Sequence, residues 1–134
     1  MDIIKLIDKA IEGRALAYTP YSKFKVGAAL LLKDGSYVLG CNIENVSYGL
    51  SNCAERTALF KLVSSGYTKE DVVAMAIVAN TENPVSPCGA CRQVMAELLC
   101  KDTPIFLANL KHTYKKTTVE DLLPYGFEEI ENAD

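Results

Sequence analysis

The sequence predicts an α/β fold of three layers, α/β/α, in which helices cover both faces of a mixed, roughly five-stranded central sheet. Helical and strand-like segments alternate along the 134 residues, which is typical of this class. An Asp-Gly turn within residues 33–36 joins two consecutive strands into a hairpin, so part of the sheet is antiparallel. Strand–helix–strand crossovers follow the hairpin, and such crossovers join parallel strands.

Helices are expected where apolar side chains recur every three or four residues. These segments are residues 2–18, 53–65, 88–100 and a short turn at 119–123. Asp2 is suited to cap the first helix, and Thr19-Pro20 ends it because the residue before a proline avoids helical dihedral angles. Ser51 or Asn52 is expected to cap the second helix, which Gly66 ends.

Strands are expected where short apolar runs lie between turn residues. They are residues 24–32, 37–42, 72–79, 105–108 and 112–116. The first and third runs are almost entirely apolar, as in strands that are covered on both faces. No linker, repeat or low-complexity tract divides the chain, so residues 1–134 are expected to form one catalytic domain.

Composition narrows the classes of function. The net charge of −3 argues against a surface built mainly from phosphate contacts, because those need a basic face. No apolar run is long enough to span a bilayer, and the N-terminus lacks a signal-peptide pattern. A cytoplasmic protein without a membrane or nucleic-acid partner is therefore expected. The five cysteines are an odd number, which does not suit a disulfide framework, and close spacing such as that of Cys88 and Cys91 favours metal binding or catalysis.

Two cysteine-containing stretches carry the candidate site, Cys53-Ala54-Glu55-Arg56 and Pro87-Cys88-Gly89-Ala90-Cys91. Each stands where a loop is expected to enter a helix, after neighbouring strands of the sheet. Cys88 and Cys91 are spaced so that both sulfurs can approach one ion, and Cys53 adds a third thiolate. Helix N-termini lower the pKa of thiols, which favours all three thiolates. Three protein ligands leave the fourth position of a zinc ion open for water.

Charged neighbours are expected to tune this centre. Three thiolates outweigh the charge of Zn²⁺ and weaken it as a Lewis acid, so a positive group should offset them. Arg56 and Arg92 each follow a ligand closely enough to donate to sulfur, and Arg56 is favoured because it adjoins both Cys53 and Glu55. Glu55 is suited to act as general base and then general acid, although a first-turn carboxylate can also simply complement the helix dipole.

Other interpretations of the cysteines stay open at this point. A Cys-x-x-Cys pair also occurs in redox dithiols and in structural zinc sites. A structural site needs a fourth ligand, and the spare candidates are Cys41, Cys100 and His112, none of which is paired in spacing with Cys53. Cys41 and Cys100 lie in apolar elements and are expected to be core thiols, and His112 an exposed strand or turn residue.

Cys53-Ala54-Glu55 followed by Pro87-Cys88-Gly89-Ala90-Cys91 resembles the signature of the cytidine/deoxycytidylate deaminase superfamily, in its three-cysteine variant. The similarity to the small, homotetrameric, zinc-dependent cytidine deaminases extends through residues 21–30, 40–45, 48–50, 54–58 and 122–127. It implies their fold, one zinc ion per subunit and a hydrolase of pyrimidine salvage. Cytidine and deoxycytidine would become uridine and deoxyuridine with release of ammonia, as a zinc-bound water activated by Glu55 attacks C4.

The same resemblance assigns contacts with the nucleoside. Asn42 and Glu44 would hold the ribose hydroxyls, and their alternation along a strand points both to one face. Phe24 would form a wall of the site, and backbone groups of Ala54 and Ser86 would anchor the base edge and the leaving amine. Without the resemblance, Asn42 and Glu44 would be read as polar residues at a strand end.

The resemblance also implies active sites shared between subunits. Phe127 would reach a neighbouring subunit and stack on the base, and Tyr48 would contact across an interface. Ordinary packing is the alternative role of these aromatic residues. Gln93 would lie with Arg56 and Arg92 in the layer around the metal ligands.

Four other functions compete with this one. The closest is a deaminase of the same build that acts on a cytosine-containing antibiotic such as blasticidin S. A nucleic-acid deaminase is disfavoured because the chain is short and acidic. A third alternative is a structural-zinc binding module, in which Glu55 would have no catalytic role. A fourth is a redox protein, which would need a free Cys88–Cys91 dithiol.

Overall fold

A mixed sheet forms the middle layer of the structure, a computed structural model that describes residues 1–130. Its strands are β1 Val26–Leu32, β2 Tyr37–Cys41, β3 Val72–Ala79, β4 Pro104–Asn109 and β5 Tyr114–Thr118. Their order across the sheet is β2-β1-β3-β4-β5, with β3 and β4 parallel and the other three pairs antiparallel. β5 begins later than predicted because His112, with a φ of 65°, belongs to the turn after β4.

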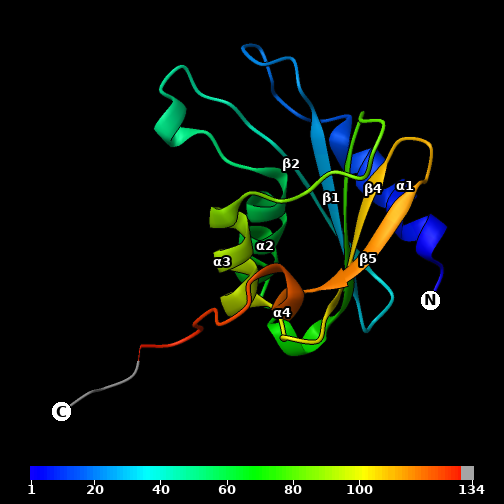
Figure 1. The fold of residues 1–134 in the computed structure, drawn as a ribbon, viewed down its shortest axis with the longest axis vertical. Helices are drawn as coiled ribbons and strands as arrows, with labels where there is room; N and C mark the ends of the chain where they lie inside the picture. Colours follow the sequence, from blue (N-terminus) through cyan, green and yellow to red (C-terminus); the bar gives the residue numbers. More distant parts are fainter. Residues whose placement is uncertain (131–134) are drawn as a thin grey trace.

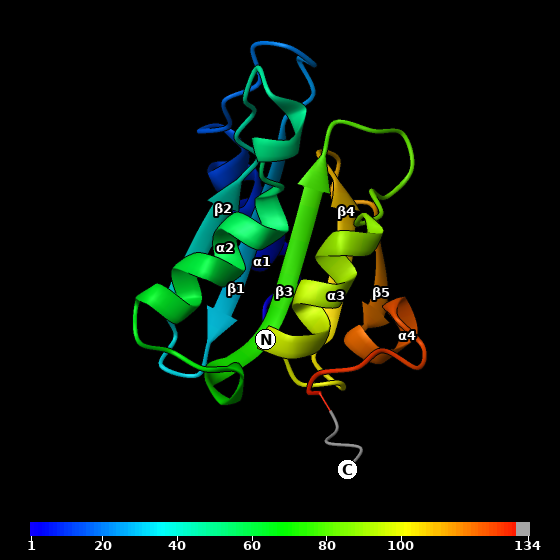
Figure 2. The same ribbon diagram turned by 90° about the vertical axis from the view of Figure 1, so that its left-hand side faces the viewer.

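Helices cover both faces of this sheet. They are α1 Ile3–Arg14, α2 Ala54–Ser64, α3 Gly89–Leu98 and α4 Val119–Leu122. α1 packs on one face, and α2 and α3 pack on the opposite face (Figure 1). Figure 2 shows α2 and α3 side by side in front of the sheet. The predicted three-layer α/β/α fold is confirmed. Within residues 1–130, no helix combines the length and the apolar character needed to cross a membrane.

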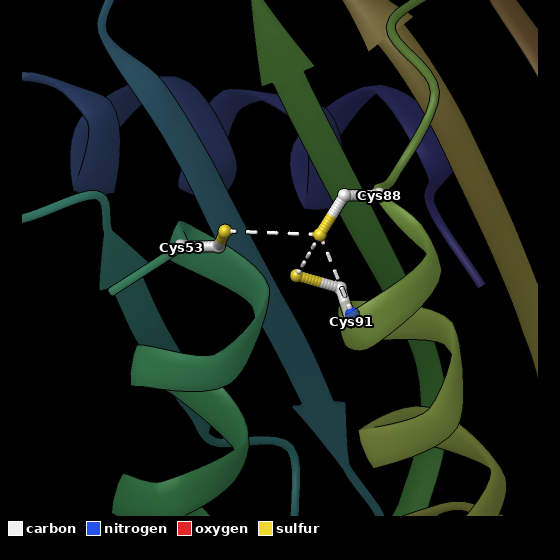
Figure 3. A group of neighbouring side chains, drawn as sticks. All are labelled: Cys53, Cys88 and Cys91. Carbon is white, nitrogen blue, oxygen red and sulfur yellow. Dashed lines mark hydrogen bonds between the residues drawn. The ribbon is translucent and has the colours of Figure 1, made fainter. Parts of the chain in front are cut away.

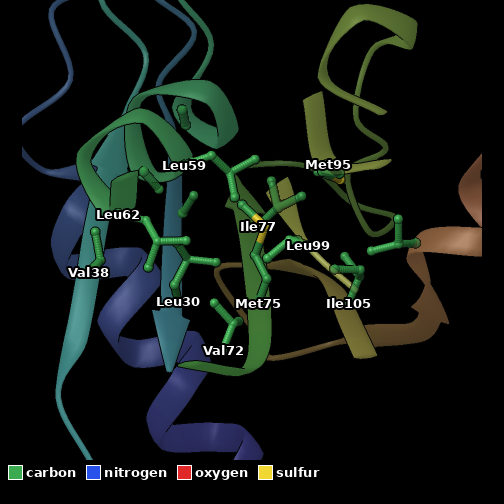
Figure 4. Close-up of a cluster of buried hydrophobic side chains, with 14 of the residues drawn as sticks. Leu30, Val38, Leu59, Leu62, Val72, Met75, Ile77, Met95, Leu99 and Ile105 are labelled. Carbon is green, nitrogen blue, oxygen red and sulfur yellow. The ribbon is translucent and has the colours of Figure 1, made fainter. Parts of the chain in front are cut away.

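The two faces of the central strands bury separate cores. On β1, Ala28 and Leu30 pack beneath α2 and α3, whereas Ala29 packs against α1. This alternation follows from the pleat, which points successive side chains to opposite faces. Figure 4 shows the core beneath α2 and α3, where Leu59 of α2 and Met95 of α3 are fully buried. The apolar runs of β1 and β3 are therefore explained by burial on both faces.

The first helix ends at Arg14 rather than at Tyr18. Asp2 caps its start as predicted, because its side chain accepts a hydrogen bond from Lys5 N at 3.0 Å. Beyond Arg14 the backbone pairs with the segment that follows β2: Tyr18 N donates to Asn42 O, and Glu44 N donates to Tyr18 O. These contacts between distant segments replace the last helical turn, a competition that local periodicity does not reveal.

Cysteines occupy the N-cap positions of the two helices that carry the candidate site, and the predicted caps Ser51 and Asn52 are wrong. Cys53 precedes α2, and Cys88 precedes α3. Asn52 is instead paired through its backbone with Ile43. The two helices were predicted to follow neighbouring strands, and this prediction is wrong. They follow β2 and β3, and β1 lies between these two strands.

Gly40 of β2 allows the first turn of α2 to approach the sheet closely. A Cβ at this position would lie 2.4 Å from Ala54 O and 2.6 Å from Ala58 N, both backbone atoms. We expect Gly40→Ala to lower the free energy of unfolding by about 1–3 kcal/mol, since α2 must shift. Urea unfolding measures this change. The control is Gly49→Ala, where a Cβ meets nothing within 4 Å; equal losses in both variants would contradict the expectation.

Candidate metal centre and active site

Three cysteine sulfurs meet between the first turns of α2 and α3 (Figure 3). Cys53 Sγ lies 3.9 Å from Cys88 Sγ, which lies 3.2 Å from Cys91 Sγ. All three sulfurs lie within 4.8 Å of one another. Tetrahedral zinc with Zn–S bonds of about 2.3 Å holds its sulfurs about 3.8 Å apart, so this donor set fits zinc. Cys91 is buried and Cys88 is exposed, which leaves one side of the cluster accessible.

A fourth protein ligand is absent from this cluster among residues 1–130. Cys41 lies at the end of β2 and Cys100 follows α3, where its thiol faces Lys69 O at 3.6 Å. Both are half-buried rather than fully buried in the core, and burial raises the pKa of both thiols. His112 pairs with Asp8 on α1, Nε2 to Oδ1 at 2.6 Å. Three ligands, rather than four, are typical of a catalytic zinc.

Hydrogen bonds and charge favour the thiolate of Cys53. The Cys91 thiol and the Arg56 guanidinium, whose Nη2 lies 3.2 Å from Cys53 Sγ, lower the pKa of Cys53 to about 5. The hydrogen bond with Cys53, together with burial, raises the pKa of Cys91. Three thiolates at these distances repel one another, so a cation between the sulfurs is needed to keep all three deprotonated. Arg56 thus makes the contact with sulfur that its position in the sequence suggests.

Glu55 lies in the first turn of α2 and is only 4% exposed. Burial raises the pKa of its carboxyl group, and the negative charge of Cys53 acts in the same direction. A buried carboxyl group beside a metal cluster is a candidate for proton transfer, because its protonated and ionised forms are brought closer in free energy near neutral pH.

Arg92 makes no contact with sulfur, contrary to the role considered for it. Its guanidinium donates instead to oxygen atoms of Ser86, Pro87 and Leu122. Gln93 Nε2 likewise donates to Phe127 O at 2.8 Å. The sequence shows that both residues follow a ligand, but the positions of the loop and of α4 decide where their side chains bind.

A cavity of about 300 Å³ opens beside the sulfur cluster, a size suited to a small ligand. The predicted site residues that line it are Phe24, Asn42, Glu44, Cys53, Ala54, Glu55, Ser86 and Cys88. Tyr48 and Phe127 do not line it, and their side chains are 76% and 65% exposed. Two of the three candidate metal ligands, the buried carboxyl group and the expected ribose contacts therefore share one cavity, whereas the third ligand, Cys91, is buried and does not line it.

Both expected ribose contacts are held by bonds within the chain. Asn42 Oδ1 accepts from Val26 N, and Asn42 Nδ2 donates to Phe24 O, each at 2.8 Å. Glu44 accepts from the backbone N–H and the hydroxyl of Ser22, and these bonds lower the pKa of its carboxyl group. Both side chains are thus held in place before a ligand binds, and Glu44 stays ionised.

Ser22 is a lining residue that the sequence did not single out. Its hydroxyl donates to Glu44 and accepts from Phe24 N at 3.0 Å, so it links two expected contacts of the nucleoside. Ser22 does lie within the stretch 21–30 that carries the family resemblance. A serine hydroxyl commonly binds nearby backbone in a turn, and this was the available signal.

Comparisons with known proteins identify the family. Residues 2–107 match the family model described as "Cytidine and deoxycytidylate deaminase zinc-binding region". A cytidine deaminase of Halalkalibacterium halodurans is 61% identical over 127 residues, which cover 95% of each chain. The crystal structure of cytidine deaminase from Burkholderia pseudomallei matches with a TM-score of 0.91 and 50% identity, over 95% of this chain and 100% of that one. A blasticidin-S deaminase of Bacillus cereus is 28% identical over 92% of this chain and 91% of its own.

The three-layer fold, the three-thiol cluster and the buried carboxyl group together define a zinc-dependent hydrolytic deaminase. More particularly, this chain belongs to the cytidine and deoxycytidylate deaminase family. The predicted zinc cofactor is thereby confirmed, and the interpretations as a redox dithiol or a structural-zinc module are set aside.

Proposed function

We propose that this protein hydrolyses cytidine and deoxycytidine to uridine and deoxyuridine with release of ammonia, as one catalytic domain over residues 1–134. The observation that carries the proposal is the shared cavity of about 300 Å³. Cys53, Cys88 and Glu55 line it together with Asn42 and Glu44, so one bound ligand can contact both the groups that carry out the chemistry and the groups that would bind ribose hydroxyls. Such a reaction suits a cytoplasmic role in pyrimidine salvage.

Cys53, Cys88 and Cys91 would hold the zinc ion through their sulfurs. When bound, zinc supplies Lewis-acid activation of a water molecule, which makes that water a nucleophile at neutral pH. Arg56 donates to Cys53 Sγ at 3.2 Å and so withdraws negative charge from the thiolates. That contact offsets the excess charge of three sulfur ligands.

Glu55 moves the protons of the reaction. Its carboxylate takes a proton from the attacking water and delivers it to N3 of the pyrimidine as oxygen adds to C4. It then passes the second proton of that oxygen to the amino group, and the C4–N bond breaks to release ammonia. One water is consumed, nothing is oxidised or reduced, and Glu55 returns to its starting state. The raised pKa suits a group that must both accept and donate.

Backbone groups orient the base within the cavity. α2 begins without a side-chain capping bond, so the N–H groups of its first turn are available to a ligand. Ala54 in that turn and Ser86 in the loop before α3 both line the cavity, where they would hold the base edge and the leaving amine. Phe24 supplies an apolar wall.

The substrate is tested by ammonia release from cytidine, deoxycytidine and blasticidin S, each with the same zinc-loaded protein. We expect rapid release from both nucleosides and at least about a hundredfold lower kcat/KM with the antibiotic, since the ribose contacts are then unused. A preference for blasticidin S would replace the proposed substrate while leaving the chemistry intact.

A homotetramer would complete the sites. Tyr48 and Phe127 are exposed and do not reach the cavity of their own chain. An apolar groove of about 440 Å³ lies between α2 and α3, with Phe60 and Val63 half-exposed along it. Exposed apolar patches of this kind favour association.

We expect Phe60→Glu to dissociate the assembly, because it places a charge in this apolar groove. Sedimentation velocity distinguishes a species of four chains in the wild type from smaller species in the variant. A wild-type protein that is stable and fully active as a monomer would contradict the homotetramer.

A further inference from the structure

The loop between β3 and α3 forms part of the cavity wall, and few hydrogen bonds hold this loop in place. Residues 80–88 lead from β3 to Cys88, and Ser86 and Cys88 line the cavity. Asn109 Nδ2 holds the start of the loop by donating to Glu82 O at 2.8 Å. Within residues 1–130, every hydrogen bond made by residues 84–87 comes from the side chain of Arg92.

The guanidinium of Arg92 binds three acceptors from two segments. Nε donates to Pro87 O at 3.0 Å, and Nη2 donates to Ser86 Oγ at 2.9 Å. Nη1 donates to Leu122 O at 3.0 Å, which is a carbonyl group at the end of α4. The last carbonyls of a helix lack partners inside it, so Leu122 O is a ready acceptor. A planar fork of five N–H groups can satisfy such a set, whereas a single ammonium group cannot reach both sides at once.

The next residue repeats the connection to the C-terminal part of the chain. Gln93 Nε2 donates to Phe127 O at 2.8 Å. Consecutive residues directly after Cys91 therefore hold the two ends of the segment 122–127. Through Arg92, this segment is joined to the loop that borders the cavity.

We propose that Arg92 is a positioning residue that holds the Ser86–Pro87 backbone at the cavity and joins it to α4. It acts through hydrogen-bond geometry and not by neutralising a sulfur ligand, since its donors all end on oxygen atoms. The inference rests on the proposed function in one respect, that Ser86 borders the base. Loss of the contacts then impairs substrate binding more than the chemical step.

Arg92→Lys separates geometry from charge, because it keeps the positive charge and removes the fork. We expect the KM for cytidine to rise about tenfold or more, the size of effect that losing charge-assisted hydrogen bonds produces. We expect kcat to change less than about threefold and zinc content to stay at the wild-type ratio. Loss of zinc with an unchanged KM would overturn the proposal in favour of a role at sulfur.

Ser86→Ala removes only the exposed hydroxyl that Arg92 binds and is the milder variant. Because both changes interrupt one contact, the double variant with Arg92→Lys should have the KM of Arg92→Lys alone. Additive increases in KM would show that Arg92 does not act through Ser86.

Limited proteolysis measures how firmly the loop is held, and it does not depend on an assay of activity. A glutamyl endopeptidase applied to the zinc-loaded protein should cut after Glu82 faster in Arg92→Lys and in Ser86→Ala than in the wild type, with fragments identified by mass. Equal cutting in all three proteins would overturn the anchoring role.

If Arg92→Lys does not fold, the rate of cutting in Ser86→Ala still tests the anchoring role. If the wild type fails to deaminate cytidine, the proposed function falls while the proteolysis still tests the anchor.

Discussion

Glu55→Gln should abolish turnover of cytidine while the protein keeps its zinc and its fold. The amide has nearly the same shape as the carboxyl group but cannot carry protons between water, N3 and the amino group. We expect kcat to fall by about four orders of magnitude, the upper range for losing one general acid–base group that serves several transfers. Initial rates, elemental analysis of zinc and thermal unfolding measure the three quantities.

A matched control is Glu12→Gln on the outer side of α1. Glu12 is exposed and, among residues 1–130, forms an ion pair only with Lys9, at 3.3 Å. This variant should match the wild type in rate, zinc content and unfolding temperature. Near-normal turnover in Glu55→Gln would show that another group transfers the protons.

Cys53→Ala should lose both zinc and activity. Cys53 makes no side-chain capping bond to α2, so the substitution removes a sulfur ligand without removing a helix cap. Two thiols remain in the cluster, and we expect the affinity for zinc to fall at least about a hundredfold. Zinc per chain after gel filtration measures this loss.

Cys41→Ala is the corresponding control, since Cys41 is half-buried at the end of β2 and lies outside the sulfur cluster. It should retain one zinc per chain. Undiminished zinc in Cys53→Ala would remove Cys53 from the ligand set and would leave Cys88 and Cys91 as a pair.

The layers of the fold could be predicted from local patterns in the sequence. A strand covered on both faces has a continuous apolar run, whereas an amphipathic helix has apolar residues every three or four positions. The residue at which α1 ends could not be predicted from these local patterns. Tyr18 continues the helical periodicity, yet its backbone pairs with Asn42 and Glu44 from a segment far along the chain. The order of the strands, with β1 between β2 and β3, is likewise set by long-range pairing.

The sulfur cluster could be predicted from spacing and residue type, but its surroundings could not. Cys88 and Cys91 are close in any helix start, whereas the approach of Cys53 depends on α2 and α3 lying side by side. Arg56 and Arg92 both follow a metal ligand closely in the sequence. Their different partners arise because the oxygen atoms of Ser86, Pro87 and Leu122 surround only Arg92.

Zinc-dependent deamination of cytidine is tested most directly by the ultraviolet absorbance of cytidine mixed with purified protein, before and after a chelator removes the metal. We predict a fall in cytidine absorbance with one ammonia released per nucleoside, its loss on chelation and its return when zinc is restored. An unchanged absorbance with zinc fully bound, or turnover that persists without metal, would contradict the proposed reaction.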